Sequence, residues 1–260
     1  MFELLSDLAA SLPPWYFCLL LLIAAFSAGF VDAIAGGGGL ITIPALLMSG
    51  LPPHLALGTN KLSATFGSFT ATVVFIRKGI FNPKDWWLLT LATLIGAIIG
   101  TFCATLISMD ILNQVLPALI ICVALYMLFQ NYSNLDQDRS PHPRPPWAQF
   151  TQGSSIGFYD GIAGPGTGSF WVVSNLMMYK QSLVQSSGIA RAMNFVSNIT
   201  SLITFAILGQ VNWLIGLLMG LLLLVGAWLG AHLAISKGAQ FIKPIFMTVV
   251  IAISVKLLTM

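Results

Sequence analysis

The stretch GFVDAIAGGG at Gly29–Gly38 returns as GFYDGIAGPG at Gly157–Gly166, and seven of these ten positions are identical. With a shift of 130 residues the match continues along the chain, pairing Phe75 with Phe205, Gly79 with Gly209, Asn82 with Asn212, Gly96 with Gly226, Gly100 with Gly230 and Lys61 with Arg191. Composition alone produces chance matches of Ala, Leu and Gly, but it does not readily align Asp, Asn and a basic residue. The sequence therefore predicts an internal duplication.

Composition predicts that the duplicated chain lies in a membrane. Its 260 residues are 57% hydrophobic and only 7% charged, with a mean hydropathy of +0.89, whereas a soluble domain carries about 25% charged residues. So few charges cannot build a water-exposed surface, and lipid must cover much of it. The basic residues are scattered without a Lys/Arg run, so we expect no nucleic-acid partner.

Apolar stretches of spanning length predict an all-α integral membrane protein. They lie at residues 15–35, 57–76, 86–108 and 111–130, and again at 147–163, 186–208, 213–235 and 241–258. Two shorter apolar pieces follow glycine-rich breaks and read as half-helices, at 40–50 and 170–179. We divide the chain into a first transmembrane repeat (1–130), a polar cytoplasmic linker (131–146) and a second transmembrane repeat (147–260).

The distribution of basic residues predicts that the two halves insert in opposite orientations. Basic residues flank the loop near residues 77–84, whereas the equivalent loop at 209–212 carries no charge. Conversely, Lys237 and Lys243 flank a loop whose first-half counterpart, near residues 109–110, has no basic residue. Because basic loops stay in the cytoplasm, we predict two inverted repeats of four to five helical segments each. Many secondary transporters have this plan, with sites at interrupted helices near the bilayer midplane.

Both copies place an aspartate, Asp32 or Asp160, three residues before a glycine-rich break. The half-helix after each break begins with free N–H groups and a partial positive charge, which bind anions. We predict a paired anion site formed by Gly36, Gly37, Gly38, Gly39, Gly164, Gly166, Thr167 and Gly168. An alternative is that the glycines only allow tight helix crossings. The aspartates either cap the breaks or bind a coupling proton or cation.

Lys61 and Arg191 are the candidate anion ligands because both lie within hydrophobic segments at equivalent positions. Each heads a polar stripe of the kind that faces other helices or a wet cavity, with Thr65, Ser68 and Thr72 in one half and Asn194, Asn198 and Ser201 in the other. We include Asn60 and Asn194 as further ligands. In the alternative interpretation both cations snorkel from helix ends to the interface, although duplication of the basic residue argues against it.

Other kinds of site lack support in the sequence. The histidines are dispersed and form no metal set, and GIAGPGTGS lacks the GK[ST] ending of a phosphate loop. No Ser/His/Asp or paired-carboxylate arrangement is visible. We therefore expect neither an enzyme nor a bound cofactor.

The runs GFVDAIAGGGGLITIPALL, ALGTNKLSATFGS and GFYDGIAGPGTGSF together resemble the sulfite exporter TauE/SafE family. The resemblance covers nearly the whole chain, from about Phe17 to Leu258. It implies a polytopic inner-membrane protein with two related halves that exports small anions such as sulfite, sulfoacetate or related organosulfonates. The second half has ARA at Ala190–Ala192 in place of the NKL at Asn60–Leu62, so the implied site is asymmetric.

Together these observations predict a secondary transporter that exports a small, sulfur-containing anion across the inner membrane by alternating access. Lys61 and Arg191 would supply positive charge, and backbone amides of the two breaks would cradle the anion. Because no ATPase motif is present, an ion or substrate gradient would drive transport. Two other classes stay open: an anion channel with the same site, and a membrane scaffold or subunit in which the repeat serves packing only.

Overall fold

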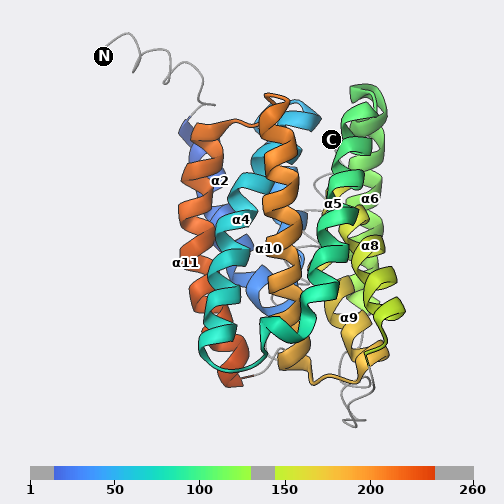
Figure 1. The fold of residues 1–260 in the computed structure, drawn as a ribbon. Helices are drawn as coiled ribbons and strands as arrows, with labels where there is room; N and C mark the ends of the chain where they lie inside the picture. Colours follow the sequence, from blue (N-terminus) through green and yellow to red (C-terminus); the bar gives the residue numbers. More distant parts are fainter. Residues whose placement is uncertain (1–14, 130–143, 238–260) are drawn as a thin grey trace.

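The computed structural model describes residues 15–129 and 144–237, and these residues form helices without any strand (Figure 1). The first half contains α2 (Trp15–Ala35), α3 (Gly39–Met48), α4 (Pro53–Arg77), the short 3₁₀ helix η1 (Pro83–Trp86), α5 (Trp87–Leu106) and α6 (Met109–Phe129). The second half contains α8 (Pro146–Ile162), α9 (Thr167–Tyr179), α10 (Leu183–Ile207) and α11 (Trp213–Lys237). The prediction of an all-α fold is confirmed.

The helices follow the predicted apolar segments closely. Helix α2 has the predicted bounds, and α3 and α9 occupy the positions of the two predicted half-helices. Among the described residues four helices are long and apolar enough to cross a membrane, namely α2, α5 together with η1, α6 and α11, which makes this a multi-pass membrane protein. The predicted segment at 241–258 and all but the last three residues of the linker at 131–146 lie outside the described residues.

Helices of each half pack against helices of the other half, and equivalent helices make equivalent contacts. Helix α5 of the first half packs along α8 of the second, and α11 of the second packs along α2 of the first. Aligned glycines permit both contacts. A Cβ atom at Gly96 or Gly100 would lie 2.1–2.3 Å from a carbonyl oxygen of α8, and one at Gly226 or Gly230 would lie 2.2–2.3 Å from a carbonyl oxygen of α2. The duplicated glycines therefore make the same close helix contact twice, as small residues do in membranes.

The two polar helices, α4 and α10, lie side by side and antiparallel (Figure 1). A Cβ atom at Gly58, near the start of α4, would lie 1.9 Å from the carbonyl oxygen of Gln210, just beyond the end of α10. Likewise, a Cβ at Gly188, near the start of α10, would lie 3.0 Å from the ring of Phe75, near the end of α4. Each helix has 25 residues and therefore spans about 37 Å. The opposite insertion of the two halves in a membrane stays a prediction.

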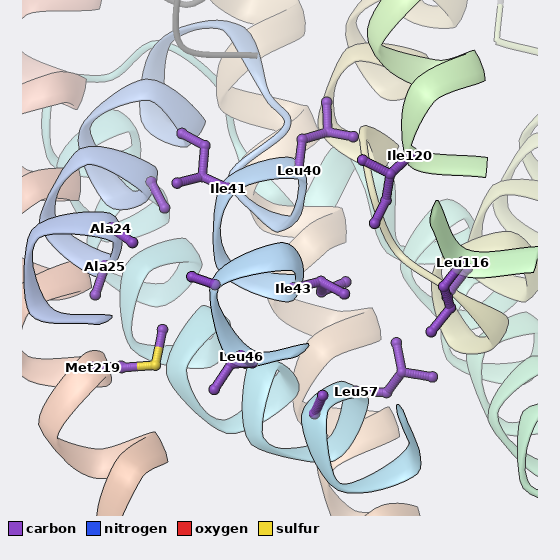
Figure 2. Close-up of a cluster of buried hydrophobic side chains, with 14 of the residues drawn as sticks. Ala24, Ala25, Leu40, Ile41, Ile43, Leu46, Leu57, Leu116, Ile120 and Met219 are labelled. Carbon is purple, nitrogen blue, oxygen red and sulfur yellow. The ribbon is translucent and has the colours of Figure 1, made fainter. Parts of the chain in front are cut away.

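The half-helix α3 lies inside a hydrophobic cluster. The side chains of Leu40, Ile43 and Leu46 are at most 1% exposed. Figure 2 shows them among buried side chains of α2, α4, α6 and α11, including Ala25, Leu57, Ile120 and Met219. At membrane depth a broken helix is tolerated only where protein or a wet cavity, not lipid, surrounds it. This cluster therefore shields the first break.

Large apolar side chains cover the outer faces of the peripheral helices. They are 38–71% exposed on α5, α6 and α11, for example at Phe102, Leu106, Ile111, Leu217, Leu221 and Trp228. In water such a surface would be costly, but it is the expected lipid-facing surface of a membrane protein. The polar side chains of α4 and α10 are instead turned inward. The polar stripes of these two helices thus lie in the interior, where they build the site.

Candidate functional site

The two glycine-rich breaks lie in direct contact. A Cβ atom at Gly36 would lie only 2.4 Å from the backbone nitrogen of Ser169, and one at Gly39 would lie 3.5 Å from the Cα of Pro165. Only a residue without a side chain fits at Gly36. Left-handed backbone turns the chain out of each helix at four glycines with φ between 74° and 103°: Gly36, Gly37, Gly164 and Gly166. The structure thus brings the breaks of the two halves together.

A narrow cavity lies between the breaks and the two polar helices, with about 30 Å³ open to the centre of a water molecule. Ten of the fourteen residues predicted for the site line it: Asp32, Gly37, Gly38, Gly39, Asn60, Asp160, Gly164, Thr167, Gly168 and Asn194. This volume is large enough to hold water when polar groups line it. The cavity is therefore the candidate functional site.

Four predicted site residues do not line the cavity. Gly36 lies in the contact between the breaks. Gly166 faces away from the cavity, because a Cβ there would lie 2.2 Å from the side chain of Val123 on α6. Lys61 and Arg191 lie behind the lining, where their charged groups contact the two aspartates. Four further residues complete the lining: Thr42, Ala64, Asn198 and Leu223. Ala64 could have been predicted as a lining residue, because the shift of 130 residues aligns it with Asn194. No pattern in the sequence predicts that Thr42 or Leu223 lines the cavity.

Each basic residue forms an ion pair with the aspartate of the other half. Lys61 Nζ lies 2.8 Å from Asp160 Oδ1, and Arg191 Nη1 lies 2.9 Å from Asp32 Oδ2. Each cation also donates a hydrogen bond to the backbone carbonyl of the same aspartate. The side chains of Lys61 and Arg191 are 1% and 0% exposed, so neither reaches an interface. Buried charges in membranes need such partners, and the snorkelling interpretation does not fit this geometry.

The two aspartates differ in their surroundings. Asp32 is 19% exposed, and its Oδ1 accepts hydrogen bonds from the backbone N–H groups of Gly37 (3.1 Å) and Gly38 (2.9 Å). Asp32 therefore caps the first break. Asp160 is only 4% exposed, and its Oδ2 accepts a hydrogen bond from the hydroxyl of Ser197 on α10. Side chains of α4 and α10 thus hold Asp160, whereas backbone amides hold Asp32.

Hydrogen-bonding groups at the cavity are left unused. Nη2 of Arg191 and Oδ1 of Asn194 are buried and have no hydrogen-bond partner among the described residues. Asn60 is different, because its Oδ1 accepts a hydrogen bond from the Thr42 hydroxyl at 2.5 Å. The described residues contain no group of three His, Cys, Asp or Glu side chains that could hold a metal ion. The site thus keeps one unused donor and one unused acceptor with which a small polar ligand could bond.

A multi-pass helical fold with a polar cavity at two interrupted helices is typical of membrane transporters. The comparisons make the assignment specific: the profile "Sulfite exporter TauE/SafE" matches residues 21–257, and the chain belongs to this family. A Sinorhizobium sp protein, "Probable membrane transporter protein ORF9", is 43% identical over 92% of this chain and 91% of its own length. A "Probable membrane transporter protein" of Haemophilus influenzae is 40% identical over 86% and 88%. "Probable membrane transporter protein YfcA" of Escherichia coli K12 is 38% identical over 92% and 88%. No solved structure matches the chain.

Proposed function

We propose that this protein is a secondary transporter that exports a small anion, either sulfite or an organosulfonate, across the inner membrane by alternating access. The observation that carries the proposal is how the protein holds Asp32. The guanidinium of Arg191 and two backbone N–H groups at a helix start bind its carboxylate oxygens. A sulfite or sulfonate group needs the same donors, because guanidinium groups and helix starts both bind oxyanions. The name of the family, which refers to sulfite export, favours this substrate class.

Alternating access is supported by the arrangement of the two halves. The cavity is narrow, so an anion can enter or leave it only if the surrounding helices move. The close contacts of α5 with α8 and of α11 with α2 link helices of different halves. In inverted-repeat transporters one repeat or helix bundle moves as a rigid body against the other, around a fixed site. We therefore propose that the two halves insert in opposite orientations and that the breaks form the fixed point.

Binding is tested first, by thermal unfolding of the detergent-solubilised protein with sulfite, sulfate, thiosulfate, sulfoacetate, taurine or chloride. A ligand that binds only the folded protein stabilises it by about 2.7 kcal/mol at a hundred times its Kd. We expect sulfite or sulfoacetate to raise the unfolding temperature and chloride to leave it unchanged. Arg191→Gln should abolish the shift. Lys84→Gln, which removes an exposed cation far along the chain from the breaks, should retain it.

Transport is then tested in proteoliposomes by exchange of labelled sulfite against unlabelled sulfite. Exchange without measurable single-channel currents supports a transporter, whereas unitary currents would identify an anion channel. If no anion stabilises a protein that unfolds cooperatively, and none is exchanged, the anion proposal is wrong. The scaffold interpretation would then explain the repeat better.

A further inference from the structure

We infer that Asp32 occupies the anion site as a competing ligand, and that a substrate anion binds Arg191 only when Asp32 has taken up a proton. The cavity would then couple about one proton to each transported anion. This inference rests on the proposed function of the cavity as an anion site and adds a coupling ion and the residue that carries it.

The donors around Asp32 are those that a free oxyanion would use. Oδ2 of Asp32 lies 2.9 Å from Arg191 Nη1, and Oδ1 accepts hydrogen bonds from two successive N–H groups, those of Gly37 and Gly38. The same donors cannot hold a carboxylate and a substrate together. In addition, two negative oxygen groups in one narrow cavity repel each other strongly, because the surrounding dielectric constant is low. Charged Asp32 therefore excludes the anion.

A second observation shows that the site has more donor capacity than Asp32 uses. Arg191 is fully buried, yet its Nη2 has no hydrogen-bond partner among the described residues. A Cβ at Gly168, a residue of the cavity wall, would lie 2.6 Å from this nitrogen. The unused N–H groups therefore lie directly behind the wall at the start of α9. An unpaired buried guanidinium nitrogen is costly, and one further ligand oxygen would satisfy it.

The charges around the cavity sum to zero before an anion arrives. Arg191 faces Asp32, and Lys61 neutralises Asp160, the other aspartate of the lining. An anion that entered alone would leave one uncompensated negative charge in the protein interior, which is unfavourable. The other titratable side chains on helices packed against α2 lie outside the lining and cannot compensate for it: His54, Arg77, Tyr179, His232 and Lys237.

Protonation of Asp32 removes the conflict. A proton from solution adds to an oxygen of its carboxylate, the ion pair with Arg191 is released, and the anion takes the place of the carboxylate at the guanidinium. For a monoanion the charge of the site is the same before and after this exchange. Asp160 is less suited to the role, since it is 4% exposed against 19% for Asp32 and is held by Lys61 and Ser197.

Coupling of this kind makes the transport of a monoanion electroneutral. The direction of net flow then follows the product of the anion gradient and the proton gradient across the membrane. Net export requires an anion gradient steep enough to exceed an opposing proton gradient.

The test compares sulfite binding to the wild-type chain with binding to Asp32→Asn and Asp85→Asn. The amide of Asp32→Asn keeps an oxygen that can accept from Gly37 and Gly38 but removes the competing charge. We expect it to bind sulfite roughly tenfold or more tightly than wild type at neutral pH. The wild-type affinity should approach that of Asp32→Asn as the pH falls. Asp85→Asn removes an exposed carboxylate outside the cavity and should behave as wild type. Protonation of sulfite itself is common to all three proteins and cancels in their affinity ratios.

A second measurement does not depend on the folding of a variant. Methanesulfonate, a monoanionic organosulfonate, keeps its charge between neutral and mildly acid pH, so its binding to wild type should take up about one proton per chain, measured by calorimetry in two buffers. Equal sulfite affinities of wild type and Asp32→Asn at every pH, or methanesulfonate binding without proton uptake, would overturn the inference and leave anion transport standing. Absence of binding and exchange for every anion would overturn both.

Discussion

The two ion pairs at the breaks each join a basic residue to an aspartate, but they are held in different ways. Asp32 contacts Arg191 and two backbone amides at the cavity, and about a fifth of its side chain is exposed. Asp160 contacts Lys61 and Ser197 and is almost completely buried. One half thus presents a carboxylate that water can reach. The other half keeps its carboxylate inside a network of side chains.

We propose that the two pairs, which the predicted repeat makes equivalent, have different tasks because their surroundings differ. A pair enclosed by α4, α8 and α10 ties three helices together, because losing either partner leaves a buried charge. A pair at the cavity can exchange one partner for a ligand at lower cost, since water already reaches it. We therefore regard Lys61–Asp160 as the structural pair and Arg191–Asp32 as the exchangeable one.

The largest effect should come from breaking the structural pair. Asp160→Asn leaves the ammonium of Lys61 buried without a counter-charge, and we expect the free energy of unfolding to fall by about 3–5 kcal/mol. Asp32→Asn should cost less, about 1–3 kcal/mol, because the Asp32 side chain is 19% exposed and the amide oxygen can still accept from Gly37 and Gly38. Both values can be measured by reversible denaturation in detergent micelles.

A double variant provides the control for this contrast. Lys61→Met combined with Asp160→Asn removes both charges, so it should recover at least half of the stability that Asp160→Asn loses. Replacing both members of a buried pair is often close to neutral. If Asp32→Asn proved as destabilising as Asp160→Asn, the distinction between an exchangeable and a structural pair would have to be given up.

A smaller effect should come from the glycines of the breaks compared with those of the loops. Gly36→Ala combines a φ of 81° with a Cβ only 2.4 Å from the backbone of α9, and we expect a loss of about 2–5 kcal/mol. Gly79→Ala also has a positive φ, of 66°, but no atom lies within 4 Å of its Cβ. It should lose only about 1–2 kcal/mol. Equal losses in thermal unfolding would show that backbone strain, and not the contact between the breaks, sets the cost.

Much of this arrangement could be predicted from the repeat alone. The doubled motif located both breaks and both aspartates, and the apolar segments located every described α-helix to within a few residues, although not the short η1. Ten of the fourteen predicted site residues line the cavity because they lie at the breaks or on the polar stripes. In a membrane, polar residues and broken helices must face protein or a wet cavity and not lipid, so these positions could be assigned to the interior.

The pairing of charges could not be predicted in the same way. An internal alignment states that Lys61 is equivalent to Arg191, but it does not state which aspartate each one contacts. The contacts join residues 99 and 159 positions apart and depend on how the halves interlock. The sequence also does not show toward which side the backbone of a break turns. Gly166 is predicted to line the site, but in the structure it faces Val123 on α6. Leu223 reaches the cavity only because α11 crosses to the first half.

The smallest effect on stability concerns an asparagine that one half has and the other lacks. Asn194 lines the cavity where the first half has Ala64, and its Oδ1 has no partner among the described residues. Asn194→Ala should therefore change the free energy of unfolding by less than about 1 kcal/mol, since no hydrogen bond of this oxygen is lost. Sulfite affinity should nevertheless fall about fivefold, because the amide can turn its NH₂ group toward an anion.

Asn60→Ala is the matched control. It removes the hydrogen bond from the Thr42 hydroxyl to Asn60 Oδ1 and leaves that hydroxyl only the Gly38 carbonyl, at 3.1 Å, so it should lose about 1–1.5 kcal/mol. If Asn194→Ala were as destabilising as Asn60→Ala, the Asn194 amide would be bonded within the protein. The wider donor capacity of the second half would then rest on Arg191 alone.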